Sequence, residues 1–497
     1  MLLNYLKTAV RNLLRQRLYA LANVVGLAVG MTCCILVMLY VRHELSYDTR
    51  HPHAKQLYRV VSDESARHAQ PLGPMLKQHM GEVAEVARIR QPLQPLISVD
   101  EVQQYRHVMF ADATLFRLFE MPFLEGDPAT ALQAPRSMVL TTDVADIYFP
   151  EGDALGKTIL WDNHHPYTVT GVVEIPPDTH LSFEILASYS TLDTGAEFAG
   201  WPTDAWNPGG QGFRLVYTFV RLVTQEPPPD FGARAMALIE RHFGEVRRDE
   251  VERRAGTPVL QPVADIHLNS TLLDEMSPGN RNSLVYGLGI IGVLILTIAS
   301  INFVNLATAR STTRAREVGV RKAIGADRGR LIGQFLGESM LLSALAVTVA
   351  MISVSLALPA FGEIVGRRLS MDLRADPVMV SMPLLVLLIC GILGGAYPAF
   401  ALSGYLPVTV LRGGRAGAAG HLRLRRILVV IQFSAAVTLI IITSVVTNQL
   451  EYLRTKDLGF AGDQIVVART AYEGVKERLA AMIPELERDP NIASAST

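Results

Sequence analysis

The segment Glu151–Thr158, EGDALGKT, comes closest in this sequence to a motif that performs chemistry. A P-loop, GxxxxGK[ST], uses backbone amides and a lysine to hold the phosphates of a nucleotide. Here Glu151 stands where the motif needs its first glycine, and the segment leads into a strand-like run instead of a helix. We therefore expect no nucleotide to bind at this segment.

Metal ligands and nucleophiles also form no recognisable pattern. The pairs His51/His53 and His164/His165 have no further ligands at the spacing of a zinc site, so surface histidines are the simpler interpretation. The sequence contains no HExxH or GxSxG motif. We therefore expect no catalytic residues, no metal site and no directly bound cofactor, which means that the chain is not itself an enzyme.

The composition indicates a membrane protein. The 497 residues are 49% hydrophobic yet 19% charged, so apolar and polar residues must be segregated along the sequence. The net charge of −1 gives no reason to expect nucleic acid as a partner. Cys33, Cys34 and Cys390 all lie in apolar runs, which indicates small buried side chains and no disulfide framework.

Five stretches are long and apolar enough to cross the hydrocarbon core of a bilayer, which takes roughly 20 residues. None of them contains Asp, Glu, Lys or Arg. The five predicted spans are Leu18–Val41, Val285–Thr308, Ser339–Ala360, Val378–Leu402 and Ile427–Val446. The first is longer than the apolar run of a signal peptide, about 7–15 residues, so we interpret it as an uncleaved anchor.

Amide side chains are the polar exceptions within the spans. Asn302 and Asn305 lie close together near the end of the second span. Amide groups in a helix bundle usually hydrogen-bond to a neighbouring helix. A place on a substrate path is the alternative interpretation of these two residues.

Basic residues determine the expected orientation, because segments that stay in the cytoplasm are rich in Lys and Arg. With five spans, the N-terminus must share one side with the segments between spans two and three and between spans four and five. All three segments are basic. We therefore expect a cytoplasmic N-terminus, and we expect the large hydrophilic region between spans one and two to lie outside.

That outside region, residues 44–282, is long enough to bury a core of its own. Leu57–Val61 and Leu215–Leu222 are rich in the residues that favour strands. Met75–Val86 and Ala233–Arg253 have the apolar spacing of amphipathic helices. The predicted fold class is an α-helical membrane protein with five transmembrane helices and an inserted α+β extracytoplasmic domain.

A basic segment, residues 309–338, joins the second and third spans. Val320, Ile324, Leu331 and Phe335 are spaced mainly by four, which predicts an amphipathic helix on the cytoplasmic face. Such a helix can lie on anionic lipid through its arginines. The alternative is a docking element for a cytoplasmic partner.

Within this segment, Arg316–Ala326 reads REVGVRKAIGA and closely resembles the signature that follows the second span of MacB/FtsX-like ABC transporter permeases. The family pattern is roughly RxxE[IV]G[IV][RL][RK]A[IL]G[AS]. The resemblance implies that this segment couples the permease to a separate ATPase. The residues that it assigns to ATPase coupling are Arg314, Arg316, Glu317, Gly319, Arg321, Lys322, Ala323 and Gly325.

The resemblance further implies a permease subunit in the inner membrane of a bacterium, with a periplasmic MacB-like domain. A cytoplasmic ABC ATPase dimer would use the ATP, and its motion would pass to the periplasmic side to export or extract a substrate (mechanotransmission). The candidate levers are Leu284–Asn305 and Arg42–Tyr47. A membrane-fusion protein is a further partner that the resemblance allows. The alternative function is an FtsX-like regulator of a cell-wall hydrolase or a sensor kinase.

The second half of the sequence looks like the start of the first half repeated. The fifth span, like the first, follows a basic segment and leads to a strand-like run, here Gln464–Ala468. Similar permeases carry the unit of one span, an outside domain and three spans twice, which gives eight spans. We expect residues 1–43, 44–282 and 283–411, the last an FtsX-like three-span domain, to form one unit. Residues 412–497 would begin a second permease unit, as in a truncated tandem protein, and a complete five-span protein is the alternative. The second unit of the working permease would come from such a tandem repeat or from a second copy of the chain in a homodimer.

Overall fold

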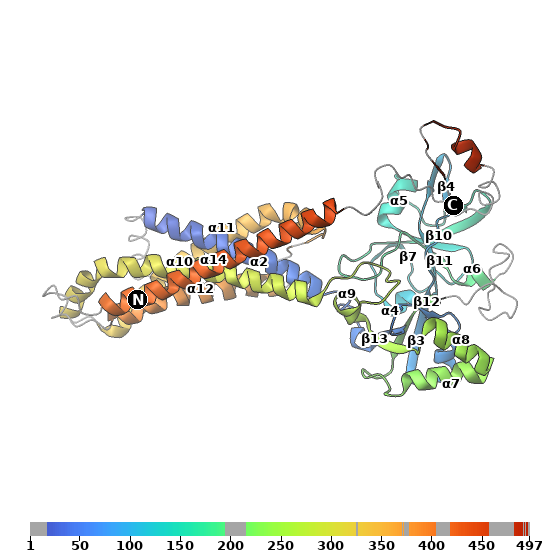
Figure 1. Ribbon diagram of the computed structural model, residues 1–497, viewed down its shortest axis with the longest axis horizontal. Helices are drawn as coiled ribbons and strands as arrows, with labels where there is room; N and C mark the ends of the chain where they lie inside the picture. Colours follow the sequence, from blue (N-terminus) through green and yellow to red (C-terminus); the bar gives the residue numbers. More distant parts are fainter. Residues whose placement is uncertain are drawn as a thin grey trace.

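The computed structural model describes residues 17–193, 215–324, 327–369, 371, 377–403, 418–456, 482–490, 492 and 494–495. The molecule is elongated, with a bundle of long helices at one end and a mixed α/β domain at the other (Figure 1). The chain enters the domain from the first long helix and leaves it into the second. We call the end of the bundle beside the domain the domain end, and the opposite end the distal end.

Five helices in the described residues are long and apolar enough to span a membrane, as predicted. They are α2 (Arg17–Leu45), α10 (Asn282–Ala323), α11 (Arg328–Val365), α12 (Pro377–Ser403) and α14 (Ala418–Thr455). Together with the inserted domain, they confirm the predicted fold class. The 42 residues of α10 rise about 63 Å, roughly twice the 30 Å thickness of the hydrocarbon core. One continuous helix therefore connects the domain with the distal end.

Small residues allow close packing of the bundle formed by α2, α10, α11 and α12. A Cβ added to Gly30 would clash with the Cβ of Ala299, so α2 and α10 approach closely there. A Cβ added to Gly394 would clash with the ring of Phe303, which brings α12 against α10 in the same way. Such contacts are typical of membrane helices, because between them van der Waals packing replaces burial from water as the main attraction.

Helix α14 is packed differently from the other four. Its main contact is with α10, and none of the residues in its apolar window is buried. Gln432 and Leu439 are half-buried, whereas every residue from Ile441 to Leu450 is exposed. The helix therefore packs along its first half only and leaves its second half, toward the domain end, uncovered (Figure 1). The strand-like run predicted at Gln464–Ala468 lies outside the described residues.

In the described part of the domain, 13 strands form one sheet. The main order is β13-β1-β12-β3-β6-β11-β8-β10-β9-β4-β5, with β2 beside β12 and β7 beside β10. The strands are β1 (Leu57–Val61), β2 (His68–Ala69), β3 (Val83–Ile89), β4 (Leu96–Val99), β5 (Val102–Tyr105), β6 (Val108–Ala111), β7 (Phe123–Gly126), β8 (Ser137–Thr141), β9 (Thr158–Trp161), β10 (His165–Val173), β11 (Ile185–Ser188), β12 (Leu215–Leu222) and β13 (Val259–Pro262). The predicted strands Leu57–Val61 and Leu215–Leu222 are both present.

Short helices pack around the sheet. They are α3 (Leu72–His79), α4 (Leu115–Leu118), α5 (Thr142–Tyr148), α6 (Ser190–Asp193), α7 (Phe231–Phe243), α8 (Glu245–Ala255) and α9 (Ile266–Asn269), with 3-10 turns η1 (Ala54–Gln56) and η2 (Val263–Asp265). The helix predicted for Met75–Val86 is wrong at its end, because Val83 already begins β3 and pairs with β12. The helix predicted for Ala233–Arg253 is interrupted at Gly244, whose φ of 82° favours glycine and ends α7.

The strands fall into two groups, each with an apolar core of its own. The first group surrounds a cluster that includes Leu76, and the second surrounds a cluster that includes Tyr167. We call the first group the continuous lobe (residues 54–89 and 215–269), because α2 and α10 adjoin it in the sequence. We call the second the insert lobe (residues 96–193), because it is inserted between β3 and β12.

The two lobes share one sheet but meet weakly within it. A single residue pair, Ile89 and Ala111, connects β3 with β6, whereas β3 and β12 pair over six residues. The Arg88 guanidinium strengthens this junction by donating to Asp112 of the insert lobe over 2.9 and 3.0 Å. A third apolar cluster, beside α4 and including Phe119, packs on both lobes. The lobes therefore have separate cores, one weak strand pairing and one apolar cluster that packs on both. We call this cluster the shared base.

Candidate functional site

The predicted coupling residues lie at the distal end, where α10 ends and α11 begins (Figure 1). Helix α10 carries the positions of Arg314, Arg316, Glu317, Gly319, Arg321, Lys322 and Ala323. Lys322 is half-buried and Ala323 is exposed. The side-chain surroundings of the other five positions, and the whole of Gly325, lie outside the described residues. The described part of the segment thus lies at the end of α10, beside the start of α11 and on the side of the bundle away from the domain; we call this place the distal turn.

An apolar cluster stabilises this turn. Val318 of α10 is buried against Leu331 and Phe335 of α11, with α12 completing the cluster. By contrast, Ile324 is 82% exposed and Val320, one helical turn before it, is 43% exposed. The predicted spacing of apolar residues therefore serves two purposes: the two residues on α11 stabilise the turn, and the two at the end of α10 face outward.

The two intramembrane amides, Asn302 and Asn305, are half-buried in α10. Asn302 lies beside α2, since a Cβ added to Gly26 would be 3.6 Å from its Nδ2. Asn305 Oδ1 is buried without a hydrogen-bond partner among the described residues. Asn302 therefore belongs to the α2–α10 interface, and Asn305 offers an acceptor inside the bundle.

A second group of polar residues lies at the domain end, where α2 leaves the bundle. The Glu44 side chain is 0% exposed and accepts hydrogen bonds from three side chains. His267 Nε2 donates over 2.6 Å, Asn280 Nδ2 over 2.9 Å and Arg367 Nε over 3.0 Å. These partners come from α9, from the segment before α10 and from the segment after α11. One buried carboxylate on α2 therefore connects the domain with the ends of three membrane helices.

Aromatic rings surround this carboxylate. The ring of Tyr47 stacks on the imidazole of His267, with centroids 3.5 Å apart and planes within 4°. The Arg367 guanidinium lies 5.5 Å from the centre of the same Tyr47 ring. Burial raises the pKa of Tyr47 to about 12, so its side chain stays neutral. The stacking fixes the plane of the His267 ring, and with it the direction in which Nε2 reaches Glu44.

Asp48, one helical turn beyond Glu44 in sequence, connects α2 to another part of the domain. Its carboxylate accepts hydrogen bonds from Thr179 Oγ1 over 2.7 Å and from His180 Nδ1 over 2.8 Å. Burial opposes ionisation of Asp48. Charge attraction and hydrogen bonding from His180, with hydrogen bonds from His51 and Thr179, outweigh burial and hold the pKa of Asp48 well below its usual range. Asp48 is therefore a buried anion at neutral pH.

The contacts at the domain end were not predicted from the sequence, although Arg42–Tyr47 was predicted to be a lever. His267, Asn280 and Arg367 at Glu44, and Thr179 and His180 at Asp48, lie 131 to 323 residues away in the chain. One local signal was available. Glu44 occupies the last turn of a mainly apolar helix, and a carboxylate in that position usually has a partner.

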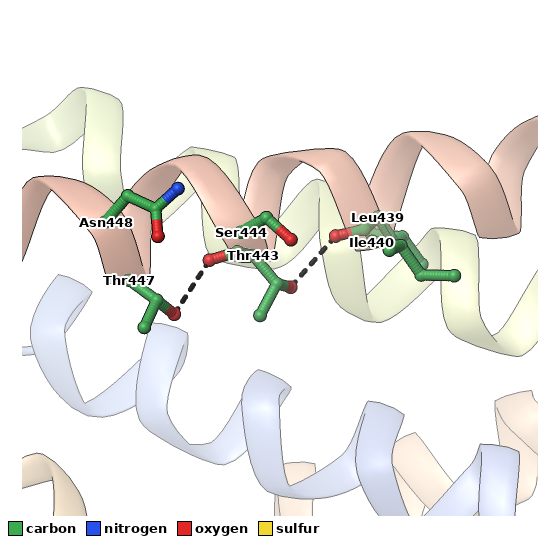
Figure 2. A pocket seen from close by; sticks show the side chains of 6 residues that line it. All are labelled: Leu439, Ile440, Thr443, Ser444, Thr447 and Asn448. Carbon is green, nitrogen blue, oxygen red and sulfur yellow. Dashed lines mark hydrogen bonds between the residues drawn. The ribbon is translucent and has the colours of Figure 1, made fainter.

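Helix α14 has a hollow on its uncovered half, lined by both apolar and polar side chains. Figure 2 shows the residues that line this hollow of about 480 Å³: Leu439, Ile440, Thr443, Ser444, Thr447 and Asn448. Thr443 Oγ1 donates to the Leu439 carbonyl and Thr447 Oγ1 to the Thr443 carbonyl, both over 2.9 Å. Because these two hydroxyl protons are already used within the helix, both hydroxyls can lie in an apolar environment at little cost.

The described residues contain no group of three or more His, Cys, Asp or Glu side chains placed to hold a metal ion. The segment Glu151–Thr158 passes directly into strand β9. It therefore lacks the helix N-terminus on which a P-loop seats a phosphate group.

Two protein families match successive parts of this chain. Residues 20–237 match the MacB-like periplasmic core domain, from α2 into α7. Residues 289–407 match the FtsX-like permease C-terminal family, which covers α11, α12 and most of α10, including the distal turn. With five helices able to span a membrane and a MacB-like periplasmic domain, the chain is an inner-membrane protein.

Two relatives by sequence and one solved structure are similar to parts of this chain. The uncharacterized ABC transporter permease YvrN of Bacillus subtilis is 26% identical over 317 residues, which cover 62% of this chain and 70% of YvrN. The macrolide export ATP-binding/permease protein MacB of Neisseria gonorrhoeae is 25% identical over 207 residues, which cover 41% of this chain. The match spans only 28% of that MacB protein. The periplasmic region of MacB from Actinobacillus actinomycetemcomitans, a solved structure, is 12% identical over 42% of this chain and 90% of its own, with a TM-score of 0.31.

Proposed function

Because this chain belongs to the MacB/FtsX-like family of ABC transporter permeases, we propose that it transmits the motion of a separate ATPase to its extracytoplasmic domain. In this proposal the N-terminus and the distal end face the cytoplasm, where a dimeric ATPase uses the ATP. The chain is a transporter component and not an enzyme. The transmitted motion exports or extracts a substrate on the domain side of the membrane.

The exposure of Ile324 is the observation that carries this proposal. Its side chain is 82% exposed on a turn where Val318, Leu331 and Phe335 are buried. The neighbouring Arg328 is exposed too, and its charge favours a place outside the hydrocarbon core. Covering a water-exposed isoleucine with a protein partner lowers the free energy of the complex, because apolar surface is removed from water. The same turn carries the family signature, which makes an ATPase the expected partner.

Helix α10 supplies the path for the motion. It runs without interruption from Asn282 to Ala323, so a displacement at one end is delivered to the other as a rigid-body shift. At the domain end, Asn280, two residues before the helix, donates to Glu44. A shift of α10 therefore acts on the same buried carboxylate that holds α2, α9 and Arg367.

Two isoleucines of nearly equal exposure provide a matched test of the docking role. Ile324 is 82% exposed at the distal turn, and Ile364 is 83% exposed at the domain end of α11. Ile324→Ser should weaken binding of the candidate ATPase at least about tenfold, or roughly 1.4 kcal/mol, and should lower permease-dependent ATP hydrolysis. Ile364→Ser should change neither quantity.

The measurement uses the full chain in nanodiscs, with ATPase binding by titration and hydrolysis by phosphate release. Equal binding by the two variants would contradict docking at the distal turn. Equal loss in both would also contradict it, because the defect would then be general to the bundle. The double variant Glu317→Ala with Arg321→Ala extends the test to the charged part of the signature and should weaken binding in the same direction.

A further inference from the structure

The exit of α2 binds the two lobes through two different carboxylates. Glu44 binds His267, which follows the continuous lobe's strand β13. Asp48, four residues later, binds Thr179 and His180 of the insert lobe. The insert lobe adjoins no membrane helix in the sequence, since β3 and β12 of the continuous lobe flank it. Its contacts with the residues that directly follow α2, Asp48 among them, are therefore its direct link to that helix.

We propose that Asp48 is a positioning residue that makes the insert lobe follow the movement of α2, while Glu44 couples the continuous lobe separately. The inference rests on the proposed function for the origin of the movement. The contacts that carry it are local to the exit of α2.

The loop that Asp48 holds is attached on several sides. The Asp48 amide donates to the Asp178 carbonyl over 2.9 Å, and Arg50 Nε lies 2.8 Å from Asp178 Oδ2. Ser277 Oγ, just before α10, donates to the His180 carbonyl over 2.9 Å. A displacement between α2 and α10 therefore acts directly on residues 178–180.

His180 passes such a displacement into the shared base of the domain. Its ring centre lies 5.8 Å from that of Phe119 in the insert lobe and 5.4 Å from that of Phe219 in β12. The weak pairing of β3 with β6 permits a small tilt of one lobe against the other, with the cluster beside α4 as the pivot. A movement of α2 would then appear as a change in the angle between the lobes.

The Asp48 contact also borders an open hollow. Its volume is about 640 Å³, and residues of the segments 48–51, 120–122 and 174–179 line it. One wall belongs to the exit of α2, and the other two belong to the insert lobe. The width of this hollow therefore depends on the contact that Asp48 makes, so a tilt of the insert lobe would open or narrow it.

Spin labels on each lobe and on α10 test the inference in the full chain in nanodiscs. Gln78→Cys marks the continuous lobe, Gln103→Cys the insert lobe and Ser283→Cys the start of α10; all three positions are exposed. The native Cys33, Cys34 and Cys390 are replaced by alanine. Distances from each lobe to α10 are measured by pulsed electron paramagnetic resonance, with the ATPase bound, before and after ADP-vanadate trapping.

In the wild type we expect both distances to change on trapping. In Asp48→Asn, which keeps the size of the side chain and removes its charge, we expect only the distance to Gln78→Cys to change, with a broadened distribution for Gln103→Cys. Thr179→Val, which removes one hydrogen bond to Asp48, should give a smaller effect in the same direction. Arg234→Gln, which breaks an ion pair between β3's neighbour Glu82 and α7, serves as the control and should behave as the wild type.

The outcomes separate this inference from the proposed function. If the distance from Gln103→Cys to α10 changes on trapping as much in Asp48→Asn and Thr179→Val as in the control, the positioning role is wrong. If no distance changes in the wild type on trapping, the proposed transmission fails and the inference falls with it. Retained ATP hydrolysis in Asp48→Asn, with loss of the insert-lobe change alone, supports the inference and distinguishes it from general misfolding.

Discussion

The two ends of the membrane bundle are built in opposite ways. At the domain end, the carboxylates of Glu44 and Asp48 are buried, and each accepts several hydrogen bonds. At the distal end, Ile324 is an apolar side chain that is 82% exposed. The domain end thus buries charged groups away from water, and the distal end exposes an apolar group to water.

This difference indicates which end is permanent and which is temporary. A buried carboxylate is stable only while all of its partners are present, so the domain end is suited to stay assembled. An exposed isoleucine is tolerated when the partner is absent and contributes when it binds. We therefore interpret the domain end as a fixed joint and the distal end as a contact that forms and breaks.

The largest expected effect comes from breaking the fixed joint. Glu44→Ala leaves His267 and Arg367 without their shared carboxylate. It should lower the free energy of unfolding by about 3 kcal/mol or more, because an incomplete buried ion network leaves uncompensated charge. Unfolding by denaturant in detergent micelles measures this change. Ile324→Ser should alter stability by less than about 0.5 kcal/mol, and equal losses in the two variants would remove the distinction between the ends.

The second prediction concerns how the stability of the α/β domain falls at acid pH, and it rests on His68, a residue of that domain. His68 is fully buried: its Nδ1 accepts from the Ala69 amide over 2.8 Å, and its Nε2 donates to the Gly256 carbonyl over 3.1 Å. Both nitrogens are thus satisfied in the neutral form. Burial lowers the pKa of His68 to about 4, and the Gly256 carbonyl only partly offsets this effect.

The folded pKa of His68 lies below the unfolded value of about 6.5, so the unfolded state binds more protons between these two values. The contribution of neutral His68 to the free energy of unfolding is fully present above about pH 6.5. It is lost as the pH falls toward 4, by about 3 kcal/mol in total. His68→Gln should flatten the pH dependence of unfolding in this window. His53→Gln, at an exposed position, should leave it unchanged, and a flat wild-type profile would contradict the assignment.

The smallest expected effect tests whether burial, and not location in the domain, makes an ion pair important. Arg234 and Glu82 form a two-pronged pair at 2.6 and 3.1 Å, but both side chains are 37% exposed. Arg234→Gln should cost no more than about 1 kcal/mol, because solvent screens exposed pairs. The pKa of Glu82, now lowered chiefly by its hydrogen bond from Arg234, should rise in the variant. Titration by NMR and denaturant unfolding measure the two quantities.

The sequence predicted the membrane helices better than the contacts at the domain end, for a physical reason. A membrane helix is recognised by a continuous apolar run. The bond between Glu44 and Arg367 joins positions 323 residues apart, which no local pattern records. The break at Gly244 was missed because helical periodicity continues on both sides of it, while one backbone angle ends α7.

The length of helix α10 fixes how its two ends are rotated relative to each other about the helix axis. Each residue in an α-helix advances the chain by about 1.5 Å and turns it by about 100°. One residue inserted within Asn282–Ala323 would therefore rotate the distal turn by about 100° relative to Asn280, whereas seven would restore its bearing to within about 20°. The number of residues in this helix thus sets the orientation of the distal turn, about the helix axis, relative to the contact between Asn280 and Glu44.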